Sequence, residues 1–285
     1  MMFSAIQTEK ATNEPSYSSP IMWARLGSLS KVIAQGLRPR QPAVMVLSLP
    51  RSGSSWVGRT LGKAVDALYL REPVTQSDKT FYYMGTVFKP DEGKVEPRYR
   101  ELADKAFMGW PDFGPHIVRF PLQWALVWRR PRRVVVKEVN PLACDWYLRR
   151  YRPRLVYLVR HPAGVALSWH KKGWLSAEPD DWRRNGEEQG RALKAALAAF
   201  GEYPSHINVI YEELCAEPLP VFERIFAFSG LVWNEAIKKY IRRSTRESEA
   251  MIHAWRPKVS PEALAALREG YGQFDLPWYR DDEEW

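Results

Sequence analysis

The segment that most constrains the fold is an apolar run that ends in a turn of small polar residues and continues as a helical pattern. The run covers residues 44–49, and the turn Pro50-Arg51-Ser52-Gly53-Ser54-Ser55 follows it. Beyond the turn, apolar residues recur at helical spacing: Trp56, Val57, Leu61, Ala64, Val65 and Leu68. A strand, a tight turn and a helix in this order bring main-chain N–H groups and the positive end of a helix dipole to one point. The segment therefore predicts a site for phosphate or sulfate.

The turn differs from the loop with which kinases and ATPases bind nucleoside triphosphates. That loop follows the pattern G-x-x-x-x-G-K-[ST], in which a lysine meets the phosphates and a hydroxyl meets magnesium. This turn has one glycine, Gly53, and no Gly-Lys pair, and Arg51 lies at its start. Its hydroxyls come from Ser52, Ser54 and Ser55. We interpret it as a loop for a shorter anionic group, bound without a metal; a serine-rich helix cap is the plain alternative.

A second segment repeats the order of strand, charged residue and helix. Apolar residues 155–159 lead to Arg160, Pro162 suits a first helical turn, and Ser168 follows the arginine by eight residues. An arginine at the carboxyl end of a strand can form two parallel hydrogen bonds to a phosphate, and a serine hydroxyl can add another. The segment predicts a phosphate contact, and its alternative is a buried strand followed by a surface arginine.

These two segments resemble the nucleotide-binding motifs of sulfotransferases that use 3′-phosphoadenosine 5′-phosphosulfate (PAPS). Residues 50–56 are similar to the family's 5′-phosphosulfate loop, and residues 155–169 are similar to its 3′-phosphate motif. The resemblance implies an α/β fold with a three-layer, P-loop-NTPase-like parallel sheet flanked by helices. It also implies transfer of a sulfuryl group from PAPS to a hydroxyl acceptor, with adenosine 3′,5′-bisphosphate (PAP) as product and no metal. Trp56 is expected to stack on the adenine, or else to be a core residue of its helix.

A carboxylate that could serve as the base follows the next predicted strand. Residues 67–70 are apolar and lead through Arg71 to Glu72. Ligands of doubly wound sheets bind beyond the carboxyl ends of the strands, so Glu72 is expected to point toward the same crevice as Arg51. Glu72 and the proline after it are similar to a Glu-Pro pair of carbohydrate sulfotransferases, which implies a general base or an acceptor contact. A solvated acid at a strand end is the alternative.

The predicted strand over residues 132–141 contains Lys137, which resembles the lysine that sulfotransferases direct at the transferring sulfuryl group. Two residues later, the aryl and steroid branch of the family has a catalytic histidine, whereas this chain has Val139. The departure moves the predicted base to Glu72, with Glu138 as the second candidate. The expected catalytic residues are therefore Glu72, Arg51 and Lys137.

Two later segments add expected nucleotide contacts. Residues 207–214 predict a strand, and its end resembles a family motif whose tyrosine lies near the adenine, here Tyr211. Residues 255–262 resemble a late family segment that precedes the closing helix, which implies that Arg256 and Lys258 reach the 3′-phosphate. The Arg-Lys-Gly of the small-molecule branch does not occur there intact.

The chain divides by pattern into an N-terminal tail with an amphipathic segment, residues 1–42, and a single sulfotransferase domain, residues 43–285. The apolar residues between 21 and 37 recur near helical spacing, and we expect this segment either to pack against the domain or to be a basic amphipathic helix on a membrane surface. Residues 74–130 are expected to form an acceptor-binding insertion and lid, because their aromatic side chains can stack on sugars. These are Phe81, Tyr82, Tyr83, Phe88, Trp110, Phe113, Phe120, Trp124 and Trp128.

The net charge of +9, from 42 Lys and Arg against 33 Asp and Glu, fits nucleic acid, an anionic membrane or a small polyanion. A nucleotide with two phosphates and a sulfate accounts for part of it, so we expect no nucleic acid. The chain lacks an apolar run of about 18 residues, and its two cysteines have no partners at metal spacing, which predicts a cytoplasmic protein.

The predicted acceptor is a small molecule or a glycan, with a carbohydrate or glycolipid favoured. Two other functions remain open. One is a metal-dependent P-loop kinase of small molecules, and the other is a non-catalytic basic module that binds nucleic acid or membranes. The sequence is silent on oligomeric state.

Overall fold

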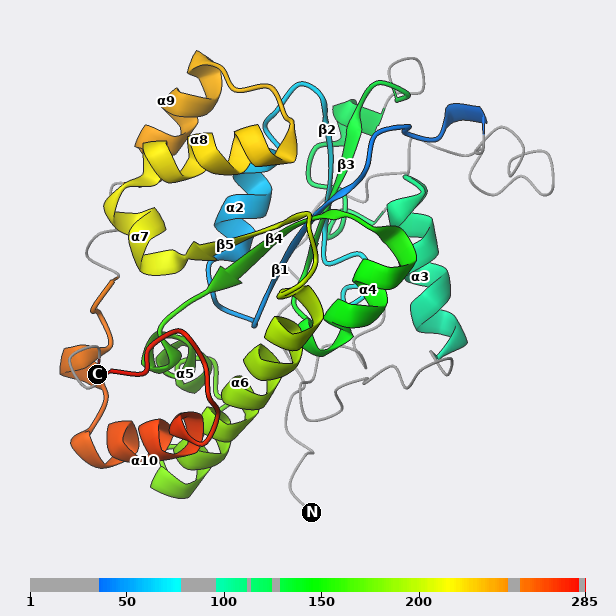
Figure 1. Ribbon diagram of the computed structural model, residues 1–285. Coiled ribbons are helices and arrows are strands. Elements are labelled where there is room, and N and C mark those ends of the chain that lie inside the picture. The colour runs from blue at the N-terminus through cyan, green and yellow to red at the C-terminus, as the bar shows by residue number, and fades with distance from the viewer. Residues whose placement is uncertain (1–35, 78–95, 112–113, 125–128, 246–251, 282–284) are drawn as a thin grey trace.

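The computed structural model describes residues 36–77, 96–111, 114–124, 129–245, 252–281 and 285. Its centre is a sheet of five parallel strands in the order β2-β3-β1-β4-β5 (Figure 1). The strands are β1 (Val44–Ser48), β2 (Ala67–Arg71), β3 (Arg133–Glu138), β4 (Arg154–Val159) and β5 (His206–Ile210). Helices cover both faces, which confirms the predicted three-layer α/β fold.

The described helices follow the strands in the chain and return it across the sheet. They are α2 (Ser54–Leu61), α3 (Pro97–Phe107), α4 (Cys144–Tyr151), α5 (Pro162–His170), α6 (Pro179–Phe200), α7 (Tyr211–Ala216), α8 (Pro218–Ser229), α9 (Glu235–Ser244) and α10 (Pro261–Gly272). Three short 3₁₀ helices, η4 (Pro121–Trp124), η6 (Pro141–Ala143) and η8 (Arg256–Lys258), lie between them.

The central strand β1 is apolar along its length because a parallel sheet between two helical layers buries both faces. Met45 and Leu47 point toward the layer of α3, α4 and α6. Val44 and Val46 point toward α2, α8 and α9, which lie on the other side of the sheet (Figure 1). All four side chains are fully buried, so the strand that leads into the serine-rich turn is held rigidly from both sides.

The described part of residues 74–130 contributes to the core. Helix α3 buries Tyr99, Leu102 and Ala103 against the sheet, and Trp124 packs on the edge formed by β2 and β3. Trp110 lies next to the guanidinium of Arg129, and Phe120 packs against Tyr69. The other aromatic residues expected in an acceptor lid lie outside the described residues: Phe81, Tyr82, Tyr83, Phe88, Phe113 and Trp128.

The strand predicted over residues 207–214 is shorter than expected. It ends at Ile210, and α7 begins at Tyr211. Glu212 and Glu213 lie in the first turn of this helix, where negative charge is favourable, and that preference outweighs the apolar pattern that suggested a longer strand. The consequence for the site is that Tyr211 lies at the junction of strand and helix.

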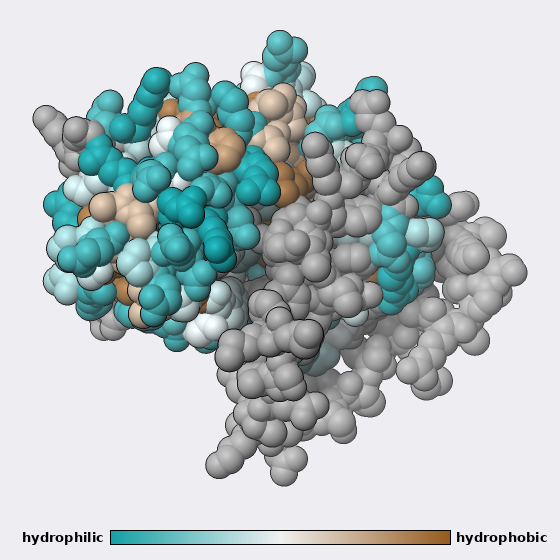
Figure 2. All heavy atoms as spheres, turned by 90° about the horizontal axis from the view of Figure 1, so that it is seen from below, coloured by the Kyte–Doolittle hydropathy of each residue, from teal (hydrophilic) through white to brown (hydrophobic). Residues whose placement is uncertain are grey.

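The remaining surface and terminal features add little to the placement of the site. Residues 1–35, which include most of the amphipathic segment at 21–37, lie outside the described residues. No helix in the described part of the chain has the length and apolar character that crossing a membrane requires. The described residues on the face shown in Figure 2 are mostly hydrophilic, with scattered apolar ones. Cys144 and Cys215 are buried and unpaired.

Candidate active site

A cavity of about 520 Å³ lies beyond the carboxyl ends of the strands. Each strand of the sheet contributes one polar residue to the cavity wall, and this residue lies at the end of the strand or directly after it. In the spatial order of the strands these residues are Glu72, Lys137, Arg51, Arg160 and Tyr211. Because the strands are parallel, residues far apart in the chain meet at one edge of the sheet, as expected for a ligand site of this fold.

The turn after β1 contains two residues with positive φ. Arg51 has φ 73° and Gly53 has φ 91°, both in the left-handed region. A Cβ atom on Gly53 would lie 2.4 Å from a ring carbon of Tyr211, so this position accepts only glycine without displacing the ring. Gly53 is also the N-cap of α2, and no side chain caps that helix and no acid lies in its first turn. The N-terminus of α2 is thus available to an anion.

The two nucleotide-binding motifs predicted from the sequence touch each other. The Arg160 guanidinium donates to the main-chain carbonyl of Arg51 over 2.9 Å, and Nε of Arg51 donates to Oγ of Ser168 over 2.8 Å. The Trp169 indole donates to the carbonyl of Pro50 over 3.3 Å. These bonds join the turn to β4 and α5, and they bring the residues expected at both ends of the nucleotide to one cavity.

Tyr211 contacts both motifs. The guanidinium carbon of Arg160 lies 4.4 Å from the centre of the Tyr211 ring, which places the cation over the aromatic face. The same ring is the one that Gly53 approaches most closely. Tyr211 therefore fixes the distance between the serine-rich turn and the arginine that follows β4.

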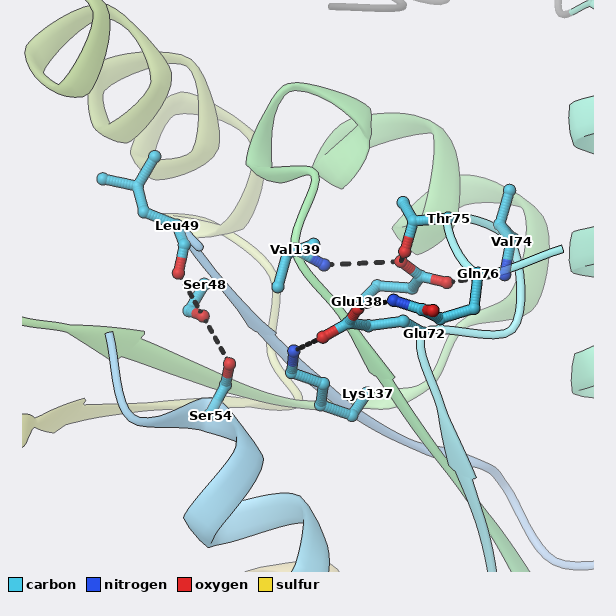
Figure 3. A network of polar contacts seen from close by, with 10 residues as sticks. All are labelled: Ser48, Leu49, Ser54, Glu72, Val74, Thr75, Gln76, Lys137, Glu138 and Val139. Carbon is cyan, nitrogen blue, oxygen red and sulfur yellow. Dashed lines mark hydrogen bonds and ion pairs between the residues drawn. The ribbon is translucent and has the colours of Figure 1, made fainter. Parts of the chain in front are cut away.

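The far end of the cavity holds a buried ion pair between Lys137 and Glu72. Figure 3 shows the two side chains pointing toward each other from β3 and from the end of β2, near Ser54 at the start of α2. Burial alone would raise the pKa of Glu72, but the facing ammonium of Lys137 and a 2.7 Å hydrogen bond from Gln76 lower it below its ordinary value. Glu72 is therefore ionised at neutral pH, as a proton acceptor must be.

Glu138, the second candidate base, lies away from the cavity wall. Its carboxylate accepts hydrogen bonds from the Val74 main chain over 2.8 Å and from the Thr75 hydroxyl over 3.1 Å (Figure 3). Burial raises its pKa to about 7. These contacts fasten the turn that carries Glu72 to β3, so Glu138 is suited to positioning Glu72 rather than to meeting an acceptor.

Most of the residues predicted for the site line the cavity. Those that do are Arg51, Gly53, Ser54, Ser55, Glu72, Lys137, Arg160, Ser168 and Tyr211. Ser48, at the end of β1, contacts Ser54, with 2.8 Å between the two hydroxyl oxygens (Figure 3). Val139 also lines the cavity, so an apolar side chain occupies the position where the related branch has histidine.

Three predicted nucleotide contacts lie outside the cavity wall. Ser52 is buried in the turn. Trp56 packs edge-on against Phe222 and donates to Oγ of Ser244 over 3.0 Å, which corresponds to its alternative as a packing residue of α2. Arg256 is exposed, and Lys258, two residues later, lines the cavity.

Several cavity residues were not predicted from the sequence. Arg71 pairs with Lys137 in the register of β2 and β3, and this neighbour relation depends on the strand order. Gly164, Leu167 and Ser168 of α5 line the cavity, as does Lys171, the C-cap residue of this helix. Their spacing of three and four residues is a helical signal that could have identified Lys171 once Ser168 was assigned. Within the described residues, no group of three or more His, Cys, Asp or Glu side chains is arranged to hold a metal ion.

Comparisons with known proteins identify the family. The model of a sulfotransferase family matches residues 42–235, and the chain therefore belongs to the sulfotransferase family. No curated protein sequence matches the chain.

Solved structures show the same fold. The sulfotransferase domain of the Synechococcus PCC 7002 olefin synthase superposes with a TM-score of 0.50 at 15% identity, over 84% of this chain and 97% of that domain. Sulfotransferase STF1 from Mycobacterium tuberculosis H37Rv superposes with a TM-score of 0.50 at 15% identity, over 88% of this chain and 82% of that one. The protein is thus a sulfotransferase with a P-loop-NTPase-like sheet.

Proposed function

We propose that this sulfotransferase transfers the sulfuryl group of PAPS to a hydroxyl of a carbohydrate or glycolipid, with Glu72 as the base. The observation that carries the proposal is the contact between the two motifs, in which Arg160 donates to the carbonyl of Arg51. The family's 5′-phosphosulfate loop and 3′-phosphate motif correspond to residues 50–56 and 155–169, and both reach the same cavity.

The residues present fit a nucleotide with a phosphate at each end. One end of the cavity has the guanidinium of Arg160 and the hydroxyl of Ser168, which can donate to the 3′-phosphate, with Lys258 on the same wall. The middle has the N-terminus of α2 and the hydroxyls of Ser54 and Ser55, which suit the 5′-phosphosulfate. PAPS supplies the activated sulfuryl group, and the protein supplies position and charge.

Sulfuryl transfer, like phosphoryl transfer, depends mainly on in-line positioning and on neutralising charge at the equatorial and leaving oxygens. We assign to Arg51 and the N–H groups at the start of α2 the task of stabilising charge on the leaving oxygen. Lys137 is held in place by its ion pair with Glu72 and can contact the transferring group from the side of β3. These residues provide the positive charge from the protein itself.

The acceptor hydroxyl must lose a proton, and among the described residues of the cavity wall Glu72 is the carboxylate that can take it. Its lowered pKa keeps it ionised, and the positive φ of 48° at Glu72 turns its side chain from the end of β2 toward Lys137. A non-glycine residue in this conformation is held there by its surroundings, and such residues cluster at functional sites. The position therefore supports a catalytic role for Glu72.

The carbohydrate acceptor rests on the Glu-Pro pair after β2 and on the absence of a histidine at Val139. Residues 74–130 stay assigned to acceptor binding as part of this proposal, because the segment leaves the sheet directly after Glu72. The buried, unpaired state of Cys144 and Cys215 supports a reducing compartment such as the cytoplasm.

Two measurements test the proposal. Calorimetry of the full chain should show PAP binding at least tenfold tighter than adenosine 5′-monophosphate, which lacks the 3′-phosphate. Incubation with ³⁵S-labelled PAPS and a panel of glycans should give labelled product and stoichiometric PAP. PAP that binds no tighter than adenosine 5′-monophosphate, or ATP binding that magnesium strengthens, would replace this proposal with the kinase alternative.

A further inference from the structure

The segment that follows α10 packs behind the cavity, beside the start of α5 (Figure 1). The hydroxyl of Tyr271, in α10, donates to the carbonyl of Trp278 over 3.0 Å and holds this segment against its helix. The next residue, Tyr279, is buried and has φ 53°. A non-glycine residue keeps this left-handed conformation only where its surroundings hold it, and such residues cluster at functional sites. The fold therefore fixes the side chain of Tyr279 in one place.

Tyr279 reaches a carboxylate that joins the ends of two strands. Its hydroxyl donates to one carboxylate oxygen of Glu212, and the other oxygen accepts from the main-chain N–H of His161 over 3.1 Å. Glu212 directly follows Tyr211 beyond β5, and His161 directly follows Arg160 beyond β4. Tyr211 and Arg160 both line the cavity. The carboxylate thus connects the two points at which β4 and β5 reach the cavity.

The imidazole of His161 is enclosed by aromatic rings. It stacks on the Trp255 ring with 4.4 Å between ring centres, and the rings of Tyr279 and Trp285 each lie edge-on to it at 4.9 Å. Its Nδ1 accepts from the main-chain N–H of Ala163 over 3.2 Å, which caps α5. These contacts hold the start of α5 in place from behind the cavity.

The guanidinium of Arg160 lies between the two points that the carboxylate connects. On the side of α7, its carbon is 4.4 Å from the centre of the Tyr211 ring. On the side of α5, a Cβ atom on Gly164 would lie 2.9 Å from its Nε, so the side chain packs directly on the first turn of the helix. A shift of α5 relative to α7 would therefore move the guanidinium off the ring.

Given the proposed function, on which this inference rests, we propose that Tyr279 and Glu212 are positioning residues for the 3′-phosphate of the nucleotide. They act through Arg160, because they fix the start of α5 against the start of α7 and so hold the guanidinium ready for the phosphate. Affinity rises when a binding group is ordered before its ligand arrives. Neither positioning residue lies on the described cavity wall, so their loss should weaken only the contacts that Arg160 makes.

The charge of Glu212 separates positioning from direct attraction. Burial raises the pKa of Glu212, and the nearby guanidinium of Arg160 opposes that rise. A carboxylate close to Arg160 repels a phosphate, so on charge alone its removal would tighten nucleotide binding. A positioning role predicts the opposite sign.

Calorimetry of the full chain with PAP and with adenosine 5′-monophosphate, which lacks the 3′-phosphate, tests the assignment. Tyr279→Phe should lower PAP affinity at least fivefold and adenosine 5′-monophosphate affinity less than twofold. Tyr203→Phe is the matched control, because the Tyr203 hydroxyl donates to the carbonyl of Pro153 over 2.6 Å, at the opposite end of β4 from Arg160. This control should change both affinities less than twofold. Equal losses for the two nucleotides in Tyr279→Phe, or unchanged PAP affinity, would overturn the inference.

Two further variants test the route through Arg160. Glu212→Leu removes both hydrogen bonds of the carboxylate and should lower PAP affinity at least tenfold, whereas tighter PAP binding would overturn the inference. Adding Tyr279→Phe to Arg160→Ala should lower PAP affinity less than twofold further, because a positioning residue has no effect once the residue it positions is gone. A further fivefold loss would show that Tyr279 acts by another route and would also overturn it. Failure of the unaltered chain to bind PAP would refute the proposed function itself, whereas equal PAP binding by the unaltered chain and Tyr279→Phe overturns this inference alone.

Discussion

The guanidinium of Arg160 donates a hydrogen bond of 2.9 Å to the main-chain carbonyl of Arg51, a residue 109 positions earlier in the chain. This bond links the arginine that follows β4 to the turn that follows β1. The side chain of Arg51 in turn reaches Ser168 on α5. The two arginines therefore belong to one hydrogen-bonded network. Because they follow different strands, their replacement is expected to affect nucleotide affinity and turnover differently.

Arg160→Ala should mainly weaken nucleotide binding. A charged hydrogen-bonding pair is worth about 1.5–3 kcal/mol, so we expect a loss of PAP affinity of tenfold to a hundredfold. Arg51→Ala should mainly slow turnover, by about a hundredfold, because its charge acts on the leaving oxygen. Calorimetry with PAP and single-turnover assays with labelled PAPS separate the two quantities. Equal losses of affinity and turnover in both variants would show that the arginines do not divide these tasks.

Glu72→Gln should lower kcat by about a hundredfold or more, because the amide cannot take the proton of the acceptor. Glu138→Gln, a matched change on the neighbouring strand, should lower kcat by less than tenfold, since Glu138 lies off the cavity wall. PAP affinity provides the check that each variant remains folded around its nucleotide site. If Glu138→Gln were the more damaging change, the assignment of the base to Glu72 would be wrong.

The pH dependence of stability should report on Glu138. Burial raises the pKa of its carboxyl to about 7 in the folded protein, against about 4.3 in an unfolded chain. Between these values the folded state keeps a proton that the unfolded state has released, so stability falls as pH rises. Urea unfolding at pH 5 and pH 7 should show that Glu138→Gln gains stability relative to the unaltered protein at the higher pH. A difference between the two proteins that does not change with pH would contradict the raised pKa.

Gly53→Ala should destabilise the protein and weaken PAP binding. A side chain in the left-handed region costs about 1–2 kcal/mol, and here the new methyl would also displace the Tyr211 ring. Gly173→Ala is the control, because Gly173 has φ 70° with nothing within 4 Å of the added Cβ, so it incurs only the conformational cost. The free energy of unfolding should fall by about 1 kcal/mol more in Gly53→Ala than in Gly173→Ala. Equal losses would mean that the ring of Tyr211 moves freely.

The strand, turn and helix at residues 44–61 and at residues 154–170 were predictable from the sequence because their conformations depend on local residue types. A glycine in a serine-rich turn and a proline after an arginine specify strand, turn and helix over a few residues. The three-layer parallel sheet was expected because residues 50–56 and 155–169 resemble the two motifs of PAPS-dependent sulfotransferases. The contact of Trp56 was not predictable in the same way, because it depends on which distant helix, here α9, lies beside it.

The ion pair of Lys137 and Glu72 shows where sequence reasoning stops. Each residue was expected at the end of a strand, but their contact requires β2 and β3 to be neighbours in a register that pairs Arg71 with Lys137. Strand order and register are set by the whole sheet and cannot be read from a single segment. Arg71 was not predicted as a cavity residue for the same reason, because its place beside Lys137 depends on that register.

The burial of that ion pair restricts how the protein can change over generations. The side chains of Lys137 and Glu72 are only 2% and 5% exposed. Replacing either one alone therefore leaves the charge of the other without its partner and poorly solvated. Two substitutions would have to arrive together for a descendant to leave this arrangement without passing through a less stable and less active ancestor. Lineages that use a different base should therefore have exchanged both positions, and the lysine and the glutamate should be inherited or lost as a unit.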